Sequence, residues 1–233
     1  MLRQVSLEEI SDGRLYGLND MVKADCQDCT GCSACCRGMG QSIVLDPLDC
    51  FRLMQGLGRS MEELLADTVE LNVVDGIILP NLKMDGQTGG CFYLGPDGRC
   101  TIHDLRPGIC RLFPLGRFYE ERSFRYFLQT GECRKENRTK VKVKKWIDVP
   151  DPNRYEQYIC DWHYFLKDCQ DALGRNRDPA AAKNISMQIL KECYLYPYEH
   201  RADFYPQFYQ QLESIKNQCN YSECAQADTG TLL

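Results

Sequence analysis

Apolar and polar residues follow different patterns in the two halves of the chain. In the first half the apolar stretches are short and end at glycine, proline or aspartate, which is typical of small strands and turns. Residues 42–45 and 123–129 are each expected to form a strand. Residues 73–78 predict a hairpin that turns at an Asp-Gly pair, and residues 91–102 predict a second hairpin that turns at residues 95–98.

Helix starts are marked by residues that satisfy the free backbone amides of a first helical turn. The Asp-Pro pair at residues 46–47 supplies an N-cap and a first-turn proline for a helix that should end at the glycines within residues 56–58. Capping boxes, in which a Ser and a Glu bond each other's backbone amides, predict two more helix starts, at residues 6–9 and 60–63. The last of these helices is expected to run to about Leu71.

The second half of the chain carries apolar positions at helical spacing. Residues 152–173, 179–195 and 206–218 are predicted helices, separated by glycine and proline. Tyrosine and phenylalanine are dense between residues 194 and 209. We interpret this aromatic stretch as helix packing, with a recognition groove as the alternative.

These patterns predict an α+β protein. A small cysteine-rich domain with short hairpins is expected over residues 1–133, a mainly helical region over residues 134–224, and a frayed tail over residues 225–233. The basic run at residues 134–145 is expected to be a solvated connector or edge strand, with phosphate binding by its lysines as the alternative.

Composition adds one anomaly, which is cysteine. The chain has 15 cysteines among 233 residues, while its 43% hydrophobic and 26% charged residues are ordinary for a globular protein. The net charge of −5 argues against a nucleic-acid-binding surface. No apolar stretch has the length of a signal peptide core or a membrane span, so we expect a cytoplasmic protein without membrane contact. In a reducing cytosol, clustered cysteines bind metal more often than they form disulfides.

The first cysteine cluster is regular. Cys26, Cys29, Cys32 and Cys35 follow one another at a constant step of three, and Cys36 is adjacent. Two thiolates separated by two residues can bind one ion, so the repeated spacing predicts a metal site. The same region contains the C-x2-C-x2-C-x3-C spacing of bacterial ferredoxins, although no second such run follows. The spacing therefore predicts metal and leaves iron and zinc both open.

A second cluster lies further along the chain. Cys91 and Cys100 flank the predicted second hairpin, which would bring their sulfur atoms close together. Cys110 follows a short turn, and Cys133 ends the cysteine-rich part of the chain. The remaining cysteines are spaced irregularly and are expected to be packed thiols, with a weak pairing signal at Cys219 and Cys224; they include Cys50, Cys160, Cys169 and Cys193.

Taken together, the two clusters resemble a known family. The first carries Cys29-x2-Cys32-x2-Cys35-Cys36, and the second carries Cys91 and then Cys100-Thr-Ile-His-Asp-x-Arg-Pro-x-x-Cys110-Arg-x-Phe-Pro. This combination is similar to the CxxCxxCC family, the YkgJ-like cysteine cluster proteins described as zinc- or iron-chelating domains. The resemblance covers residues 26–133. Ser33 stands where members usually have glycine, and His103 stands where they usually have an aromatic residue.

The resemblance implies a set of metal ligands: Cys29, Cys32, Cys35, Cys36, Cys91, Cys100 and Cys110, with Cys133 as an eighth. Eight thiols would fill two four-coordinate sites, or one cubane and one mononuclear site. The extra Cys26 leaves open which cysteine begins the set, and His103 is either a ligand or a donor behind one. Arg106 and Arg111 flank Cys110 and either compensate the charge of an anionic cluster or form ordinary surface or ion-pair contacts.

Sulfur-only ligation and adjacent cysteines favour an iron–sulfur cluster of the [4Fe–4S] type, with zinc or mononuclear iron as the alternative. The expected function is metal binding with a redox or structural role. The cysteine domain also resembles that of flagellin lysine N-methylases, which implies an S-adenosylmethionine-dependent protein lysine methyltransferase as the alternative. Against this, no glycine-rich cofactor loop follows a predicted strand. The expected partner is a protein substrate or a redox partner.

Overall fold

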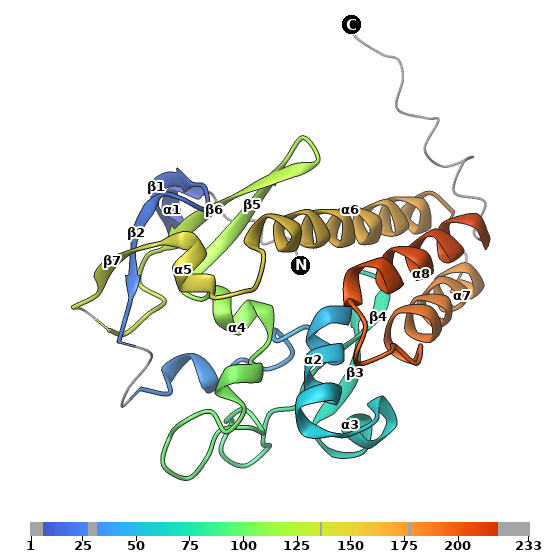
Figure 1. The fold of residues 1–233 in the computed structure, drawn as a ribbon, viewed down its shortest axis with the longest axis horizontal. Helices are drawn as coiled ribbons and strands as arrows, with labels where there is room; N and C mark the ends of the chain where they lie inside the picture. The colour runs from blue at the N-terminus through green and yellow to red at the C-terminus, as the bar shows by residue number, and fades with distance from the viewer. Residues whose placement is uncertain (1–6, 28–31, 136, 177–178, 219–233) are drawn as a thin grey trace, which may run out of the picture.

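The computed structural model describes residues 7–27, 32–135, 137–176 and 179–218. Short antiparallel strands occupy the N-terminal part and helices occupy the C-terminal part (Figure 1), which confirms the predicted α+β class. No helix in these ranges is both long and apolar enough to cross a membrane. The capping box at residues 6–9 and the tail at 225–233 lie wholly or partly outside the described residues, as do Cys219 and Cys224.

The strands pair antiparallel in three small sheets. β6 (Ser123–Gln129) has the bounds that its alternating sequence predicts, and it pairs with a neighbour on each side. Within the described ranges, the three sheets are β1 (Ser11–Tyr16) with β6 and β5 (Leu115–Glu120), β2 (Met21–Asp25) with β7 (Thr139–Lys142), and β3 (Val69–Val74) with β4 (Ile77–Leu82). The predicted edge strand in the basic run is β7. A four-residue helix, α1 (Leu7–Ile10), precedes β1.

The β3–β4 hairpin confirms the Asp-Gly turn. Asp75 and Gly76 have φ values of 48° and 88°, the left-handed conformation that a two-residue hairpin turn of the primed type requires. On the other side of β4, residues 42–45 were expected to be a full strand. They form only one bridge, between Val44 and Asn81, because the chain turns into a helix directly afterwards.

Two capped helices follow one another in the cysteine-rich part. α2 (Pro47–Leu57) begins at Asp46 and ends at Gly58, whose φ is 63°, as the sequence predicts. α3 (Met61–Asp67) begins at its predicted capping box but ends well before Leu71. The reason is tertiary, because the residues from Val69 onward pair along the whole of β4.

The C-terminal helices pack against one another and against α2. In Figure 1 the longest helix, α6, runs beside α7 and α8. α6 covers Pro152–Asn176, α7 covers Pro179–Ile189 and α8 covers Phe204–Gln218. A π-helical turn, η3 (Leu190–Tyr194), extends α7, and a short α5 (Val143–Ile147) precedes α6.

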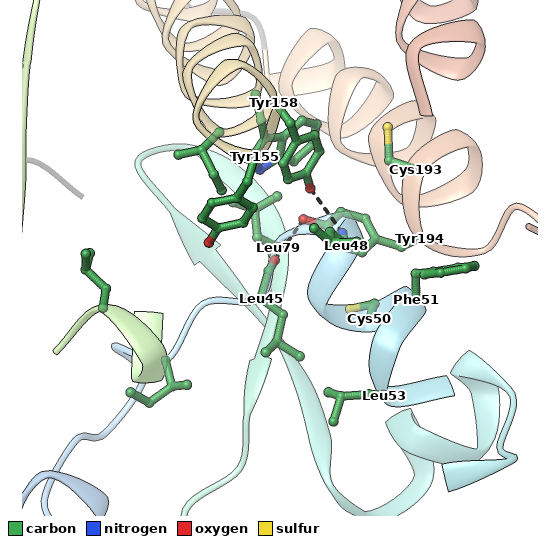
Figure 2. Close-up of a cluster of buried hydrophobic side chains, with 14 of the residues drawn as sticks. Leu45, Leu48, Cys50, Phe51, Leu53, Leu79, Tyr155, Tyr158, Cys193 and Tyr194 are labelled. Carbon is green, nitrogen blue, oxygen red and sulfur yellow. Dashed lines mark hydrogen bonds between the residues drawn. The ribbon is translucent and has the colours of Figure 1, made fainter. Parts of the chain in front are cut away.

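One hydrophobic core contains residues from both parts of the chain (Figure 2). The Tyr158 hydroxyl on α6 accepts a hydrogen bond from the Leu48 amide over 3.0 Å, and the Tyr194 hydroxyl on η3 donates to the Leu45 carbonyl over 2.9 Å. Tyr194 is almost fully buried in this core. The favoured interpretation of the aromatic stretch as packing therefore holds for Tyr194, Tyr198, Phe204 and Phe208, which are buried. The domain boundary at residue 133 stays a prediction.

Candidate metal centre

Six of the predicted ligands line one pocket. Its walls come from three segments that are far apart in the sequence: the turn around η1 (Ala34–Cys36), the turn between Cys91 and Cys100, and α4 (Gly108–Leu112). The pocket encloses about 120 Å³. A water molecule in the liquid occupies about 30 Å³, so there is room for several atoms. The cysteines that line it are Cys32, Cys35, Cys36, Cys91, Cys100 and Cys110.

The rest of the pocket wall is mainly apolar. The indole N–H of Trp146 donates to the carbonyls of Leu112 (3.3 Å) and Phe113 (3.2 Å), which fixes its ring beside α4. Polar lining comes from Arg99, His103 and Arg106, and no described Asp or Glu lines the pocket. Sulfur is therefore the main donor atom that this pocket offers to a bound group.

Backbone hydrogen bonds join the first cysteine turn to the second cluster. The amide of Cys91 donates to the carbonyl of Cys36 over 2.7 Å, and the amide of Gly38 donates to the carbonyl of Gly89 over 2.8 Å. Arg37 and Gly90 form an antiparallel bridge between these two bonds. Cys36 and Cys91 are thus placed side by side by main-chain pairing.

A turn returns the chain from Cys91 to Cys100. The amide of Leu94 donates to the carbonyl of Cys91 over 2.8 Å, and the amide of Gly95 donates to the carbonyl of Arg99 over 2.7 Å. Leu94 and Cys100 form an isolated bridge. The predicted hairpin at residues 91–102 is therefore present as a tight turn with single bridges rather than as two strands.

α4 carries Cys110 and is fixed at its first residue. The amide of Gly108 donates to Oδ1 of Asp49 on α2 over 2.8 Å. A Cβ atom at position 108 would collide with the hydroxyl of Tyr155, so this contact requires glycine. A 3₁₀ turn, η2 (His103–Leu105), precedes α4 and packs against α2.

Arg111, on α4 itself, hydrogen-bonds to the turn before this helix and to the residue that follows α5. It is buried, and its guanidinium donates to the carbonyls of Arg106 and Asp148, each over 3.1 Å, and to that of Asp104. These hydrogen bonds go to backbone oxygen, and Nη1 of Arg111 also lies 3.8 Å from Oδ2 of Asp148, an ion pair. The structure thus gives Arg111 a role in fixing the loop around α4, in agreement with the ion-pair alternative, and Arg111 is not part of the pocket lining.

Four of the pocket thiols influence one another. Burial raises the pKa of Cys91, Cys100 and Cys110 above the ordinary thiol value. Negative charge on a neighbouring thiolate raises the pKa of Cys91, through Cys100 and Cys36, and that of Cys100, through Cys36. The pKa of Cys110 is raised further by the charge of Asp49 and then by those of Cys91, Cys36 and Cys100. Without a cation Cys91, Cys100 and Cys110 are therefore protonated near neutral pH, and a bound cation would favour their thiolate forms.

His103 and Arg106 lie together at the pocket wall. Nη1 of Arg106 is 3.1 Å from Nδ1 of His103, and it also contacts Nε2. Arg106 therefore faces the imidazole that the sequence offered as a ligand. Arg106 also lines the pocket, as a residue that compensates the charge of an anionic cluster would have to.

The donor set fits a thiolate-bound metal or cluster. Cysteine thiolates bind zinc and build iron–sulfur clusters, and an apolar wall limits the access of water. Within the described ranges, no three His, Cys, Asp or Glu side chains form a group that would hold a single ion. The thiols are instead distributed around the wall of a pocket that is several atoms wide.

The other predicted cysteines fall outside this pocket or outside the described residues. Cys29 lies among residues 28–31 and is not described. Cys133 follows β6 and is not part of the pocket lining, and neither is the buried Cys26. Cys50, Cys169 and Cys193 are fully buried, as expected for packed thiols, and the half-buried Cys160 donates to the carbonyl of Arg122.

Comparison with known protein families agrees with this geometry. The family model described as CxxCxxCC, a putative zinc- or iron-chelating domain, matches residues 28–139. The match spans 112 of the 233 residues, a little under half of the chain. All six cysteines of the pocket lie within it, so the pocket falls in a segment that is similar to a zinc- or iron-chelating cysteine cluster. No curated protein and no solved structure matched the chain.

Proposed function

We propose that the pocket holds a [4Fe–4S] cluster and that Cys36, Cys91, Cys100 and Cys110 are its four ligands. One observation carries this proposal: four thiols from three distant segments meet in one apolar pocket and interact through their charges. Four thiolates are the ligand number of such a cluster. When bound, it would supply one-electron transfer, and it would also join the three segments.

The choice of iron over zinc rests on the size of the pocket and the number of its thiols. A structural zinc site is closed by four ligands around one ion. This pocket has six thiols and space for several atoms, and in the described residues no three candidate ligands converge on a single ion position. Cys32 and Cys35 supply further thiols at the same wall. No observation favours the S-adenosylmethionine-dependent methyltransferase alternative.

Protein purified without oxygen tests this proposal. We expect it to be brown and to contain iron and acid-labile sulfide in equal amounts, near four of each per chain. Cys36→Ser should lower both contents severely, because it removes a ligand at the join between two segments. Cys160→Ser is the matched control, since Cys160 lies on α6 outside the pocket and donates to the backbone carbonyl of Arg122, between β5 and β6. A colourless protein with stoichiometric zinc would reject the cluster.

A further inference from the structure

α2 makes two buried contacts at its first turn. In one, the Tyr158 hydroxyl of α6 accepts from the Leu48 amide (Figure 2) and donates to Oδ1 of Asp46 over 3.1 Å. In the other, Asp49 accepts from the Gly108 amide of α4. The start of α2 therefore contacts both the C-terminal helices and the helix that carries Cys110.

Asp49 differs from an ordinary helix-capping residue. In the capping box, its Oδ2 accepts from the Asp46 amide over 3.2 Å, while its own amide donates to Oδ1 of Asp46 over 2.8 Å. An N3 carboxylate in such a box usually bonds only its own helix. Here the second oxygen, Oδ1, accepts from a residue 59 positions away along the chain, and Asp49 is buried.

The contact is enforced by close packing. Gly108 lies so near α6 that any side chain there would meet the Tyr155 hydroxyl. Further along α2, a Cβ at Gly56 would likewise collide with the Leu105 side chain of η2. α2 thus supports the segment from η2 to α4 at two points, and one of them is a hydrogen bond to a buried carboxylate.

We propose that Asp49 is a positioning residue for the metal centre: its carboxylate fixes the first residue of α4 and so holds the Cys110 thiol in the pocket. The inference rests on the proposed function only in taking Cys110 as a ligand. Residues that orient ligands without touching the metal typically change metal affinity by about 10–100-fold when they are removed.

The chain offers a matched control for the loss of a cap. Glu63 occupies the same capping-box position in α3, where it accepts from the Ser60 amide over 2.7 Å, but it is exposed and does not line the pocket. Asp49→Ala and Glu63→Ala therefore remove equivalent capping bonds. The tether to α4 is lost only in the first variant.

Two measurements test the inference on the full chain. In metal-free, reduced protein, the alkylation rate of each thiol by iodoacetamide is followed by mass spectrometry. Asp49→Ala should speed the reaction of Cys110 relative to Cys160, and Glu63→Ala should leave that ratio at the wild-type value. In the second measurement, Asp49→Ala should lower the affinity for Zn²⁺, used as the probe ion, by about tenfold or more.

The conservative pair Asp49→Asn and Glu63→Gln repeats both measurements and serves if the alanine variant does not fold. An asparagine carbonyl still accepts from Gly108, so Asp49→Asn should retain most of the protection of Cys110. Equal rates at Cys110 in Asp49→Ala and wild type, or an equal rise at Cys110 and Cys160, would overturn the inference. The alkylation assay needs no metal, so its result is independent of whether iron is found in the wild-type protein.

Discussion

The thiols of the pocket owe their positions to main-chain hydrogen bonds more than to side-chain packing. Cys36 and Cys91 are joined by one backbone bond, and the turn to Cys100 is closed by others. Cys110 depends in addition on a side chain from a distant helix, through the bond of Gly108 to Asp49. At the residue scale, the site is therefore most sensitive to substitution at the thiols themselves and at Asp49.

A histidine away from the pocket gives a pH-dependent prediction. The His163 ring stacks on Tyr119 with their centroids 3.5 Å apart, and burial lowers the pKa of His163 from 6.5 to about 4, with positive charges that include Arg117 acting in the same direction. The unfolded chain therefore binds more protons than the folded one between about pH 6.5 and 4. The stability contribution of this group is complete above pH 6.5 and is lost as the pH falls.

His163→Phe keeps a flat ring on Tyr119 and removes the titration. We expect the free energy of unfolding in urea to fall less for this variant than for wild type between pH 7 and pH 5, with reductant present. Thiols that lose metal at low pH affect both proteins alike, so the difference between them isolates the histidine. Parallel pH profiles for the two proteins would contradict the assignment.

The sequence predicted the site better than it predicted its surroundings. Spacing and resemblance named all six pocket thiols, because repeated Cys-x-x-Cys spacing is typical of metal ligands. They also named Cys133, which lies outside the pocket lining. Asp49 was predicted neither as a cap nor as a tether, since its partner Gly108 is distant in the chain. A single sequence carries no local signal for such a contact.

At the scale of elements, the short α4 shows how closely the segments are packed. Gly108→Ala would push a methyl group against the Tyr155 hydroxyl, which sits on a rigid ring. We expect the variant to lose about 1–3 kcal/mol of unfolding free energy, the usual cost of overpacking. The gain in helix propensity from glycine to alanine, about 1 kcal/mol, offsets only part of this loss.

A double variant tests this mechanism. Tyr155→Phe removes the oxygen that the new methyl group would meet, while the next ring atom would be 3.7 Å away, an ordinary contact distance. It also removes a 3.2 Å hydrogen bond from Arg117, so the single Tyr155→Phe variant has a cost of its own. In urea denaturation the two substitutions together should cost less than the sum of their separate effects. Strict additivity would show that the clash is absent.

Elements were predictable where a local rule decides them. Capping residues and the Asp-Gly turn placed the starts of α2 and α3 and the β3–β4 hairpin, and helical spacing placed α6. The prediction failed where pairing with a distant strand decides the outcome. α3 ends early because β3 pairs with β4, and β1 and β2, which pair with β6 and β7, were not predicted.

At the scale of the whole molecule, the family match and the hydrophobic core have different limits. The match to the CxxCxxCC model ends at residue 139, yet the buried surface of α2 is completed by α6 and η3 beyond it. Leu48 and Phe51 on α2 are buried, Tyr158 bonds the Leu48 amide, and Phe51 packs on Phe204 with ring centroids 5.2 Å apart. The cysteine pocket therefore rests on a helix whose other side belongs to the C-terminal region.

A fragment of residues 1–150 tests whether the domain is independent of that region. Removing the C-terminal helices would expose the apolar side of α2 and leave Asp46 without its bond from Tyr158. Each large apolar side chain exposed in this way costs about 1.5–3 kcal/mol, and a few such losses equal the whole stability of a typical domain. We expect the fragment to show no cooperative thermal unfolding by circular dichroism and to bind Zn²⁺ more weakly than the full chain.

A fragment that unfolds cooperatively and retains full-chain affinity would establish the cysteine domain as a separate folding unit, as the boundary at residue 133 predicts. That result would also show that the contact between α2 and α6 is not needed to hold α4 in position.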